Sequence, residues 1–312
     1  MARELLFSCL IINFLLRIRS VRVPMQDVVS GGVAQDQIPA LPGANKRLRF
    51  DRIKRTPFKD SDLVIGIFRN GRAKAYPLKI MNYHEIVNDY IGSQPIAVTY
   101  CPLCHTTPVF VRKVGRTVTT FGTSGRLYQS CLVMYDRLSN SWWSQPWGVA
   151  IAGKRTNDTL TGIPAYVTTV GKWKRLHPNS LVLSTNSGYR RDYFSYPYGN
   201  YFTSNTVMFA VRKQLFLNSL NLHPKDVVSY VRLSQPGFHP WAHFGGLTEY
   251  VSHKRLKEAR TLTVERSYFR ITFQWDPQLD TVRAYRYDKR SRAMNEMPAP
   301  TSFAFAYLAL FG

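Results

Sequence analysis

Cysteine is scarce in this chain, with four residues among 312. Small secreted domains that depend on disulfides carry cysteine at a much higher density, so that class is excluded. Cys9 lies in an apolar N-terminal stretch, which leaves three cysteines for the body of the protein. Two of them, Cys101 and Cys104, have a spacing used by metal sites, redox centres and haem attachment sites, and they are the centre of the functional analysis.

Acidic residues are also few: 19 Asp and Glu stand against 42 Lys and Arg, which gives a formal net charge of +23. Such an excess favours an acidic partner, for example RNA, an anionic membrane surface or an acidic protein. The charge is spread widely, and its densest part is the segment 46–59. The alternative is a solvated basic surface without a partner.

Long hydrophobic runs are absent. The apolar run over residues 5–16 is too short to cross a bilayer as a helix, so we expect no transmembrane span in the mature protein. The run suits the apolar region of a signal peptide, which predicts an extracytoplasmic or secreted protein. The arginines that follow also suit a mitochondrial presequence, and a mitochondrial location is the alternative.

The chain does contain enough apolar residues for a large core, at 45% of the sequence. Residues 24–44 are rich in glycine, proline and polar residues, so residues 1–37 are interpreted as a targeting segment followed by a linker. We expect the ordered protein to divide into residues 38–206, which carry the candidate site, and residues 207–312.

Strand patterns dominate the ordered part. Residues 62–68 are rich in β-formers and lead into Asn70-Gly71, a strong hairpin signal because both positions tolerate positive φ. Apolar residues at helical spacing predict a helix over residues 78–87, and candidate strands follow at 95–100, 109–114, 117–121 and 132–135. The sequence therefore predicts an α+β fold that is mainly β.

The last third of the chain repeats the order of the first part. The run that begins at Asp226 matches the run that begins at Asp62, and the segments 247–251, 271–273 and 287–288 match the predicted helix, 98–100 and 135–136. This common order predicts two related halves, each a β-hairpin, helix and strand unit, produced by duplication. Only the first half contains the cysteine pair.

Two motifs are shared with a known family. The chain carries Asn82-x-His84-Glu85-Ile-Val-Asn-Asp and, shortly after it, Tyr-Cys101-Pro-Leu-Cys104. It thereby resembles a bacterial and archaeal family known as domain of unknown function 3179, over about residues 38–199 and more faintly to the C-terminus. The resemblance implies a fold and the place of a site, and it adds no reaction.

The first hypothesis for the cysteine pair is a transition-metal site. Thiolate sulfur binds zinc or copper well, and two cysteines at this spacing supply two ligands from one turn. The predicted ligand set is Cys101, Cys104, His84 and His105. Cys131 and the pair His239 and His243 are further ligand candidates.

Two alternatives use the same residues. A Cys-x-x-Cys pair is typical of thiol redox centres, although the extended sequence after it gives no helix to acidify a thiol. Cys101-Pro-Leu-Cys104-His105 also matches the attachment motif of haem c, with His105 as an axial ligand and Met134 as a conceivable second one.

Several polar residues suggest other chemistry. Ser124, His84 and Asp136 have the types required for a nucleophile, a base and an orienting residue, and Glu85 with Asp136 offers an acid/base pair. The structural alternative is that Ser124 and Asp136 shape turns. Residues near the same candidate pocket that could contact a small ligand are Trp143, Ser144 and Gln145.

The high net charge supports an alternative without catalysis. A basic chain built on an enzyme-like domain could be an accessory subunit of a larger assembly, such as a mitochondrial, RNA-containing or respiratory complex. The sequence thus predicts a protein with a metal or small-ligand site in its first half, and leaves its reaction open.

Overall fold

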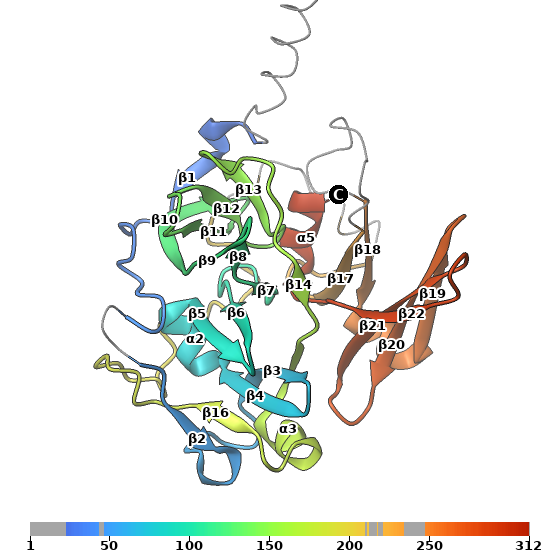
Figure 1. Ribbon diagram of the computed structural model, residues 1–312, viewed down its shortest axis with the longest axis horizontal. Coiled ribbons are helices and arrows are strands. Elements are labelled where there is room, and N and C mark those ends of the chain that lie inside the picture. The colour runs from blue at the N-terminus through green and yellow to red at the C-terminus, as the bar shows by residue number, and fades with distance from the viewer. Residues whose placement is uncertain are drawn as a thin grey trace, which may run out of the picture.

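The computed structural model describes residues 23–43, 47–209, 211, 217, 221–233 and 247–311. With 43% strand and 13% helix it confirms a mainly β protein with several antiparallel sheets (Figure 1). The predicted targeting segment over residues 1–22 lies outside the described residues, as do His239 and His243. Within the described part of the chain, every helix is too short or too polar to traverse a bilayer.

A first unit of the fold begins with the predicted hairpin. Its turn is formed by Asn70 and Gly71, with φ of 49° and 72°, as the sequence predicts. In chain order the unit contains β3 (Leu63–Arg69), β4 (Arg72–Pro77), α2 (Leu78–His84), β5 (Ile86–Ile91), β6 (Gln94–Thr99), β7 (Val109–Val111), β14 (Gly162–Ile163), β15 (Tyr166–Thr169) and α3 (Val170–Leu176). Two further strands, β2 (Phe50–Arg52) and β16 (Leu181–Leu183), extend the β3–β4 sheet in the order β15-β3-β4-β16-β2.

The helix predicted over residues 78–87 is wrong at its C-terminal end. Glu85 has φ of 57° and ends the helix, and Ile86–Ile91 forms strand β5. Ile86 and Val87 are both fully buried, because β5 is covered on both faces. Apolar residues with helical spacing therefore also suit a strand that has no solvent face.

An insert separates β7 from β14. It contains β8 (Lys113–Val114), β9 (Thr117–Val118), β10 (Phe121–Tyr128), β11 (Cys131–Asp136), β12 (Trp142–Ser144) and β13 (Val149–Ala152). Strand β1 (Val28–Ser30), preceded by the short helix η1 (Met25–Asp27), pairs with β10 and completes the sheet β1-β10-β11-β12-β13. The expected linker is therefore wrong in part, because residues 28–30 belong to a sheet of the core.

A second unit follows. In chain order it contains β17 (Val227–Leu233), β18 (Leu247–Ser252), α4 (His253–Ala259), β19 (Thr261–Glu265), β20 (Phe269–Asp276), β21 (Thr281–Asp288), β22 (Met294–Met297), β23 (Thr301–Phe303) and α5 (Ala304–Phe311). The helix expected at residues 247–251 is wrong, because that segment is strand β18 and the helix begins at His253. The sheet β19-β20-β21-β22 projects from the body of the molecule (Figure 1).

The two units share their order of elements, and the insert interrupts only the first. Each seven-residue helix, α2 and α4, ends at a residue with positive φ, Glu85 at 57° and Arg260 at 65°. The carbonyl of that residue accepts a hydrogen bond from an aromatic residue of the next hairpin: Tyr100 to Glu85 at 2.8 Å and Trp275 to Arg260 at 2.9 Å.

The closing helices are fixed by equivalent hydrogen bonds as well. The first amide of α3, from Val170, donates to the carbonyl of Asp62 at 2.8 Å. The first amide of α5, from Ala304, donates to the carbonyl of Asp226 at 2.9 Å. Asp62 and Asp226 are the residues that the sequence comparison aligned.

The two units dock onto each other reciprocally. After β6, the turn of the first unit meets β23 of the second, where Phe303 N donates to the Cys104 carbonyl at 2.8 Å. After β20, the turn of the second unit meets β15 of the first, where Thr168 Oγ1 donates to the Leu279 carbonyl. The cysteine turn therefore lies where the first unit, the second unit and the insert meet.

Candidate functional site

Cys101 and Cys104 lie in the tight turn between β6 and β7. The turn is closed by a hydrogen bond from Cys101 N to the Thr106 carbonyl at 3.0 Å, and His105 within it has φ of 54°. Both side chains are buried, at 1% and 0% exposure, and both are free thiols. The sequence placed this pair correctly on a loop between two strands.

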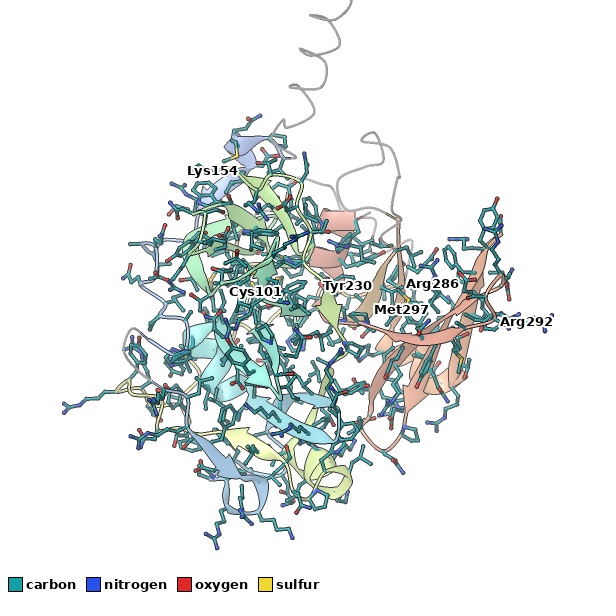
Figure 2. All side chains as sticks on the ribbon, in the orientation of Figure 1. Cys101, Lys154, Tyr230, Arg286, Arg292 and Met297 are labelled. Carbon is teal, nitrogen blue, oxygen red and sulfur yellow. The ribbon has the colours of Figure 1, made fainter. Side chains whose placement is uncertain are left out.

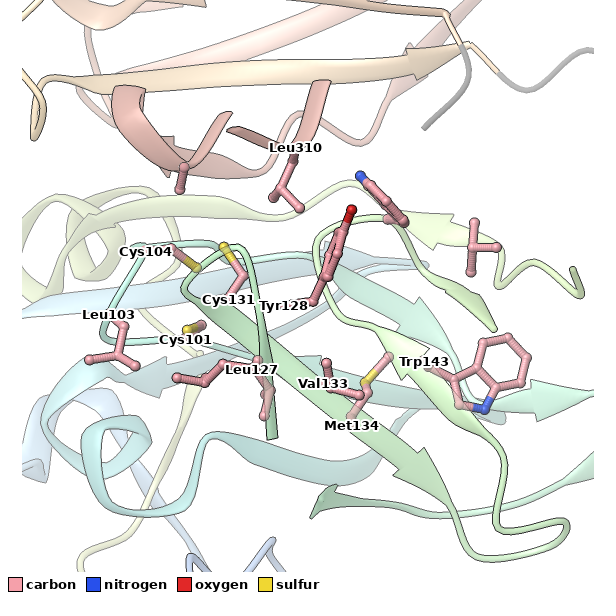
Figure 3. Packing of buried hydrophobic residues seen from close by; sticks show 14 of the residues in the cluster. Cys101, Leu103, Cys104, Leu127, Tyr128, Cys131, Val133, Met134, Trp143 and Leu310 are labelled. Atoms are coloured by element: carbon pink, nitrogen blue, oxygen red, sulfur yellow. The ribbon is translucent and has the colours of Figure 1, made fainter. Parts of the chain in front are cut away.

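A third thiol completes the cluster. Cys131 begins β11, directly after a turn in which Gln129 and Ser130 have positive φ. Side-chain hydrogen bonds join Cys104 to Cys101 and to Cys131, and burial raises the pKa of all three thiols. Figure 3 shows the three sulfur atoms gathered in one apolar cluster beside Leu103 and Leu127.

Glu85 is the acidic member of this cluster. The positive φ that ends α2 places its side chain in the interior, where it is 6% exposed. Burial raises the pKa of Glu85 to about 8, against an opposing hydrogen bond with Tyr198 that lowers it. The charge of Glu85 also contributes to the raised pKa of the Cys101 thiol. At neutral pH this carboxyl is therefore mainly protonated.

A tyrosine-rich segment, residues 189–201, covers α2 and the cysteine turn; we name it the tyrosine strap. Its phenols bond the residues around the site: Tyr193 contacts His84 Nε2 at 2.6 Å, Tyr198 contacts Glu85, and Tyr201 donates to the Leu103 carbonyl at 2.7 Å. Its density of tyrosines was the available signal, but their partners are far away in the chain.

His84 is turned away from the thiols. Its Nδ1 lies 2.7 Å from the Pro39 carbonyl, and its Nε2 lies 2.6 Å from the Tyr193 hydroxyl. The side chain is fully buried. These contacts use both ring nitrogens to hold the N-terminal segment and the tyrosine strap, so the predicted role of His84 as a metal ligand does not fit this geometry.

His105 also points away from the thiols. Its Nδ1 lies 3.2 Å from the Tyr100 hydroxyl, and its ring lies 5.1 Å from that of Phe303 and 5.3 Å from that of Phe202. Burial, and secondarily the charge of His253, lowers the pKa of His105 to about 3. The imidazole is thus neutral and packed between the two units.

The haem hypothesis fails a test of space. The cavity beside His105 has a volume of about 180 Å³. Pockets for drug-sized ligands measure roughly 300 to 1,000 Å³, and a porphyrin needs no less. With both thiols at or below 1% exposure as well, the residues present do not fit a covalently attached haem.

The predicted zinc or copper ligand set is brought together only in part. Cys101 and Cys104 are adjacent, whereas His84 and His105 are directed elsewhere. Across the residues that the structure describes, no group of three or more His, Cys, Asp or Glu side chains is positioned around a potential metal ion. The three sulfurs contact one another through hydrogen bonds instead.

Ser124 and Asp136 have local structural roles. Ser124 Oγ donates to the Val133 carbonyl, across an irregular part of the β10–β11 pairing. Asp136 accepts hydrogen bonds from the amide and hydroxyl of Ser139, at 2.6 and 2.7 Å, and from Trp143 Nε1 at 2.8 Å. Among the described residues no hydrogen bond joins Ser124, Asp136 and His84, so the structure does not assemble the predicted nucleophile, base and orienting residue. Glu85 and Asp136 share no hydrogen bond there either.

Gln145 connects the insert to the cysteine turn. Its Oε1 accepts from Thr106 Oγ1 at 2.6 Å, and Thr106 Oγ1 lies 3.1 Å from Cys104 Sγ. Trp143 and Ser144 are buried in β12, at 0% and 1% exposure. Of the three residues predicted to contact a small ligand, Gln145 is the one that the described hydrogen bonds join to the turn, through one intervening hydroxyl.

Comparison with known proteins identifies the family without a function. No curated protein and no solved structure shows significant similarity to this chain. A family model described as a protein of unknown function, DUF3179, matches residues 35–309, which includes both units and the insert. The match covers most of the chain, and the chain therefore belongs to the DUF3179 family.

Proposed function

We propose that the three thiols form a redox centre in which Cys104 is the central residue. The observation that carries this proposal is the pair of side-chain hydrogen bonds of Cys104, which accepts from the Cys101 thiol and donates to Cys131. Either neighbour is thus placed to form a disulfide with Cys104. The Cys101–Cys104 spacing is one that redox proteins use for reversible disulfides.

The redox step is a two-electron oxidation. Two thiols form one S–S bond and release two protons and two electrons, which reduce a low-molecular-weight disulfide to two thiols. The third thiolate then attacks Cys104 in the Cys101–Cys104 disulfide and releases Cys101 as the leaving thiolate. The disulfide thereby moves from Cys101 to Cys131 without a further oxidant.

Thiolate formation needs a proton acceptor, because burial raises the pKa of every thiol in the cluster. The charge of Glu85 acts on Cys101, and its pKa of about 8 is near the operating pH that suits a general base. The backbone amide of Cys104 also donates to the Cys101 sulfur, which favours its thiolate. In this proposal Glu85 receives the proton of Cys101 in those molecules in which its carboxyl is ionised, which are a minority at neutral pH and the majority above pH 8.

The test uses the full chain with Cys9→Ser, equilibrated in glutathione buffers from about −300 to −180 mV. Acid quenching, alkylation and mass mapping then count the free thiols. We expect the parent protein to lose two of its three remaining thiols. Cys101→Ser should form the Cys104–Cys131 disulfide, and Cys104→Ser should keep both of its thiols.

Two outcomes would overturn the redox proposal. In the first, all three thiols stay reduced in the most oxidising buffer, although the same thiols form disulfides after denaturation. In the second, Cys104→Ser forms a disulfide as readily as the parent. Retention of the parent's circular dichroism spectrum is the control for folding in every variant.

A second candidate function is binding of zinc or copper by the same cluster. Sulfur and carboxylate oxygen are donors that suit these metals, and Cys101, Cys104, Cys131 and Glu85 would hold the ion only after a rearrangement, because the described structure does not group them around one point. The thiols would have to separate and lose their protons on binding. One equivalent of metal that is lost in Cys131→Ser and kept in His84→Ala is the expected result, and metal kept in Cys131→Ser would exclude this arrangement.

We also propose that the two units arose by duplication of one segment. Support comes from their shared order of elements and from the equivalent backbone hydrogen bonds at both helices. Under this proposal the insert was added to the first copy alone, and it contributes Cys131 and Gln145 to the site. Refolding of a circular permutant that begins at the second unit would test whether the units form one cooperative fold.

A reversible disulfide also fits the predicted location. We propose that the protein works outside the cytoplasm, where disulfides persist, and a mitochondrial location remains the alternative. Fractionation of cells that express the full chain with a C-terminal tag distinguishes these compartments. Cleavage of the N-terminal segment, measured by mass, should accompany either location.

A further inference from the structure

Seven exposed cations gather along one border of the first unit. They lie on the segment that leads into β2, on β2 itself, on the short helix η2 (Ile53–Arg55), on the loop after η2 and on α3, which packs against η2. We name this surface the basic edge, and it consists of Arg47, Arg49, Arg52, Lys54, Arg55, Lys59 and Arg175. Within the described chain none of these seven side chains has an ion pair.

The projecting sheet of the second unit is different, although it is also rich in basic residues. There Arg270 pairs with Glu265 at 2.5 Å, Lys289 pairs with Glu265 at 2.9 Å, and Arg283 pairs with Asp276 at 2.7 Å. Its positive charge is therefore largely neutralised within the sheet. The basic edge keeps its charge unbalanced, so its field acts on solutes.

The geometry of the basic edge is linear. β2 is the last strand of its sheet, and no other described strand pairs with its outer side. Alternate residues of an extended segment, such as Arg47 and Arg49, are about 7 Å apart along the strand. Five of the seven cations are arginines, whose guanidinium groups bind phosphate oxygens in pairs.

We propose that the basic edge binds the sugar–phosphate backbone of a single-stranded nucleic acid. The arginines that precede β2, end it and continue on η2 follow one stretch of chain and suit a linear chain of phosphates, whereas a lipid surface requires cations spread over a flat face. The contacts are made to phosphates, so we expect strong dependence on salt and little dependence on base sequence. The proposal is independent of the thiol centre, because none of the seven residues contacts the cysteines.

Charged residues on an edge strand also prevent pairing with the strands of other molecules. The test must therefore separate a binding surface from a merely protected edge. It measures fluorescence anisotropy of a fluorescein-labelled single-stranded RNA with the full chain, over a series of salt concentrations. The basic-edge variant carries Arg52→Glu and Arg55→Glu.

The matched control carries Arg290→Glu and Arg292→Glu on the projecting sheet, where Figure 2 labels Arg292. Both variants change the net charge equally. We expect the basic-edge variant to bind at least about tenfold more weakly, and the slope of log K against log salt to become shallower by about 1.4. The control should retain the parent slope and bind within about threefold of the parent.

Three results would overturn the proposal. One is an equal loss of affinity in both variants, which would show that binding depends on net charge alone. Another is the absence of salt-dependent RNA binding by the parent protein. The third is binding to phosphatidylserine vesicles, lost in the basic-edge variant, without RNA binding, which would assign the surface to anionic lipid.

Discussion

Two turns of this molecule have the same backbone and different chemistry. Cys101-Pro-Leu-Cys104-His105 follows β6 in the first unit, and Asp276-Pro-Gln-Leu-Asp280 follows β20 in the second. The fifth residue of each has φ of 54°. In each turn the first side chain accepts a hydrogen bond from the amide of the fourth residue, a thiol in one case and a carboxylate in the other.

The comparison separates what the turn does from what its side chains do. In the second unit Asp276 Oδ1 accepts the amides of Gln278 and Leu279, at 2.9 and 3.0 Å, and its other oxygen accepts Arg283 Nε at 2.7 Å. This arrangement is complete and needs no ligand. In the first unit the same amide faces a thiol, with Glu85 and two further thiols around it. At both Cys101 and Asp276 a backbone amide favours a negatively charged side chain. Only Cys101 has other reactive side chains around it.

The largest expected effect on the free energy of unfolding concerns the packing of the closing helices, α3 on β3 in the first unit and α5 on β17 in the second. In the first unit Gly66 leaves room for the fully buried Trp173 ring, and a Cβ at Gly66 would lie 2.5 Å from that ring. Trp173→Ala should therefore lower the free energy of unfolding by about 3 to 5 kcal/mol, because it leaves a cavity and frees Ser180 from the indole N–H. Urea denaturation measures this change.

The control for this substitution lies in the second unit. There strand β17 carries the large residue, Tyr230, whose ring is 5.8 Å from that of Tyr307 of α5. Tyr307→Phe keeps the ring and removes only a hydroxyl bonded to Thr248, so it should cost about 1 kcal/mol. Equal losses from the two substitutions would contradict the packing difference between the units.

The next prediction concerns the residues that end α2 and α4, Glu85 and Arg260. Because burial raises the pKa of Glu85 from 4.5 to about 8, the folded state holds a proton that the unfolded state releases. Its contribution to stability is therefore full below the unfolded value and is lost as pH rises toward 8. Glu85→Gln should remove a decline of a few kcal/mol between about pH 5 and pH 8.

The measurement is the difference in unfolding free energy between parent and Glu85→Gln at each pH. The difference isolates Glu85 from His105 and His253, whose pKa values are lowered by burial and act with the opposite sign at acidic pH. Arg260→Gln is the matched variant at the equivalent position. A flat difference for Glu85→Gln would show that this carboxyl titrates normally in the folded protein.

A smaller effect is expected when the second turn loses its acceptor. Asp276→Ala leaves the amides of Gln278 and Leu279 and the Arg283 guanidinium without this partner, which should cost about 2 kcal/mol. Hydrogen bonds from the Leu279 and Gln278 amides and the Arg283 side chain together lower the pKa of Asp276 against an opposing effect of burial. Its contribution is therefore present above the unfolded pKa and lost as pH falls through the folded value.

Asp276→Asn tests the charge separately, because the amide keeps an oxygen for the two backbone donors. It should retain most of the stability near neutral pH and lose the dependence on acid. Thermal unfolding of both variants between about pH 3 and pH 7 provides the comparison. If the alanine and asparagine variants have the same melting temperature at every pH, the Asp276 carboxylate does not stabilise this turn.

The first half of this fold could be predicted from local patterns. Asn70-Gly71 fixed the first hairpin, and the alignment of Asp62 with Asp226 found the start of both units, because turn residues and strand starts depend on near neighbours. The end of α2 could not be found in this way. The positive φ of Glu85 places its carboxyl in the buried interior, a requirement of tertiary structure that leaves no local periodicity in the sequence.

The structure brings together only part of the predicted metal-ligand set. Cys101 and Cys104 were found because their spacing is itself the signal. His84 was assigned to the metal because of its position in sequence, while its ring in fact holds Pro39 and Tyr193, which are 45 and 109 residues away. Contacts over such separations depend on how the chain crosses itself, and a single sequence does not encode them in a readable form.

The smallest expected effect lies on the projecting sheet of the second unit. Arg270 and Lys289 both pair with Glu265, but their side chains are 47% and 38% exposed and that of Glu265 is 51% exposed. Solvent screens such pairs, so Arg270→Ala and Lys289→Ala should each change the free energy of unfolding by less than about 1 kcal/mol. The double variant should show little coupling, because solvent screens both pairs. Urea denaturation at low and high salt measures both terms. A loss above about 2 kcal/mol would mean that ion pairs, rather than the buried face of Phe269, Ile271 and Phe273, hold this sheet together. The ion pairs of the second unit would then be structural, and the two units would differ less than the comparison of their turns indicates.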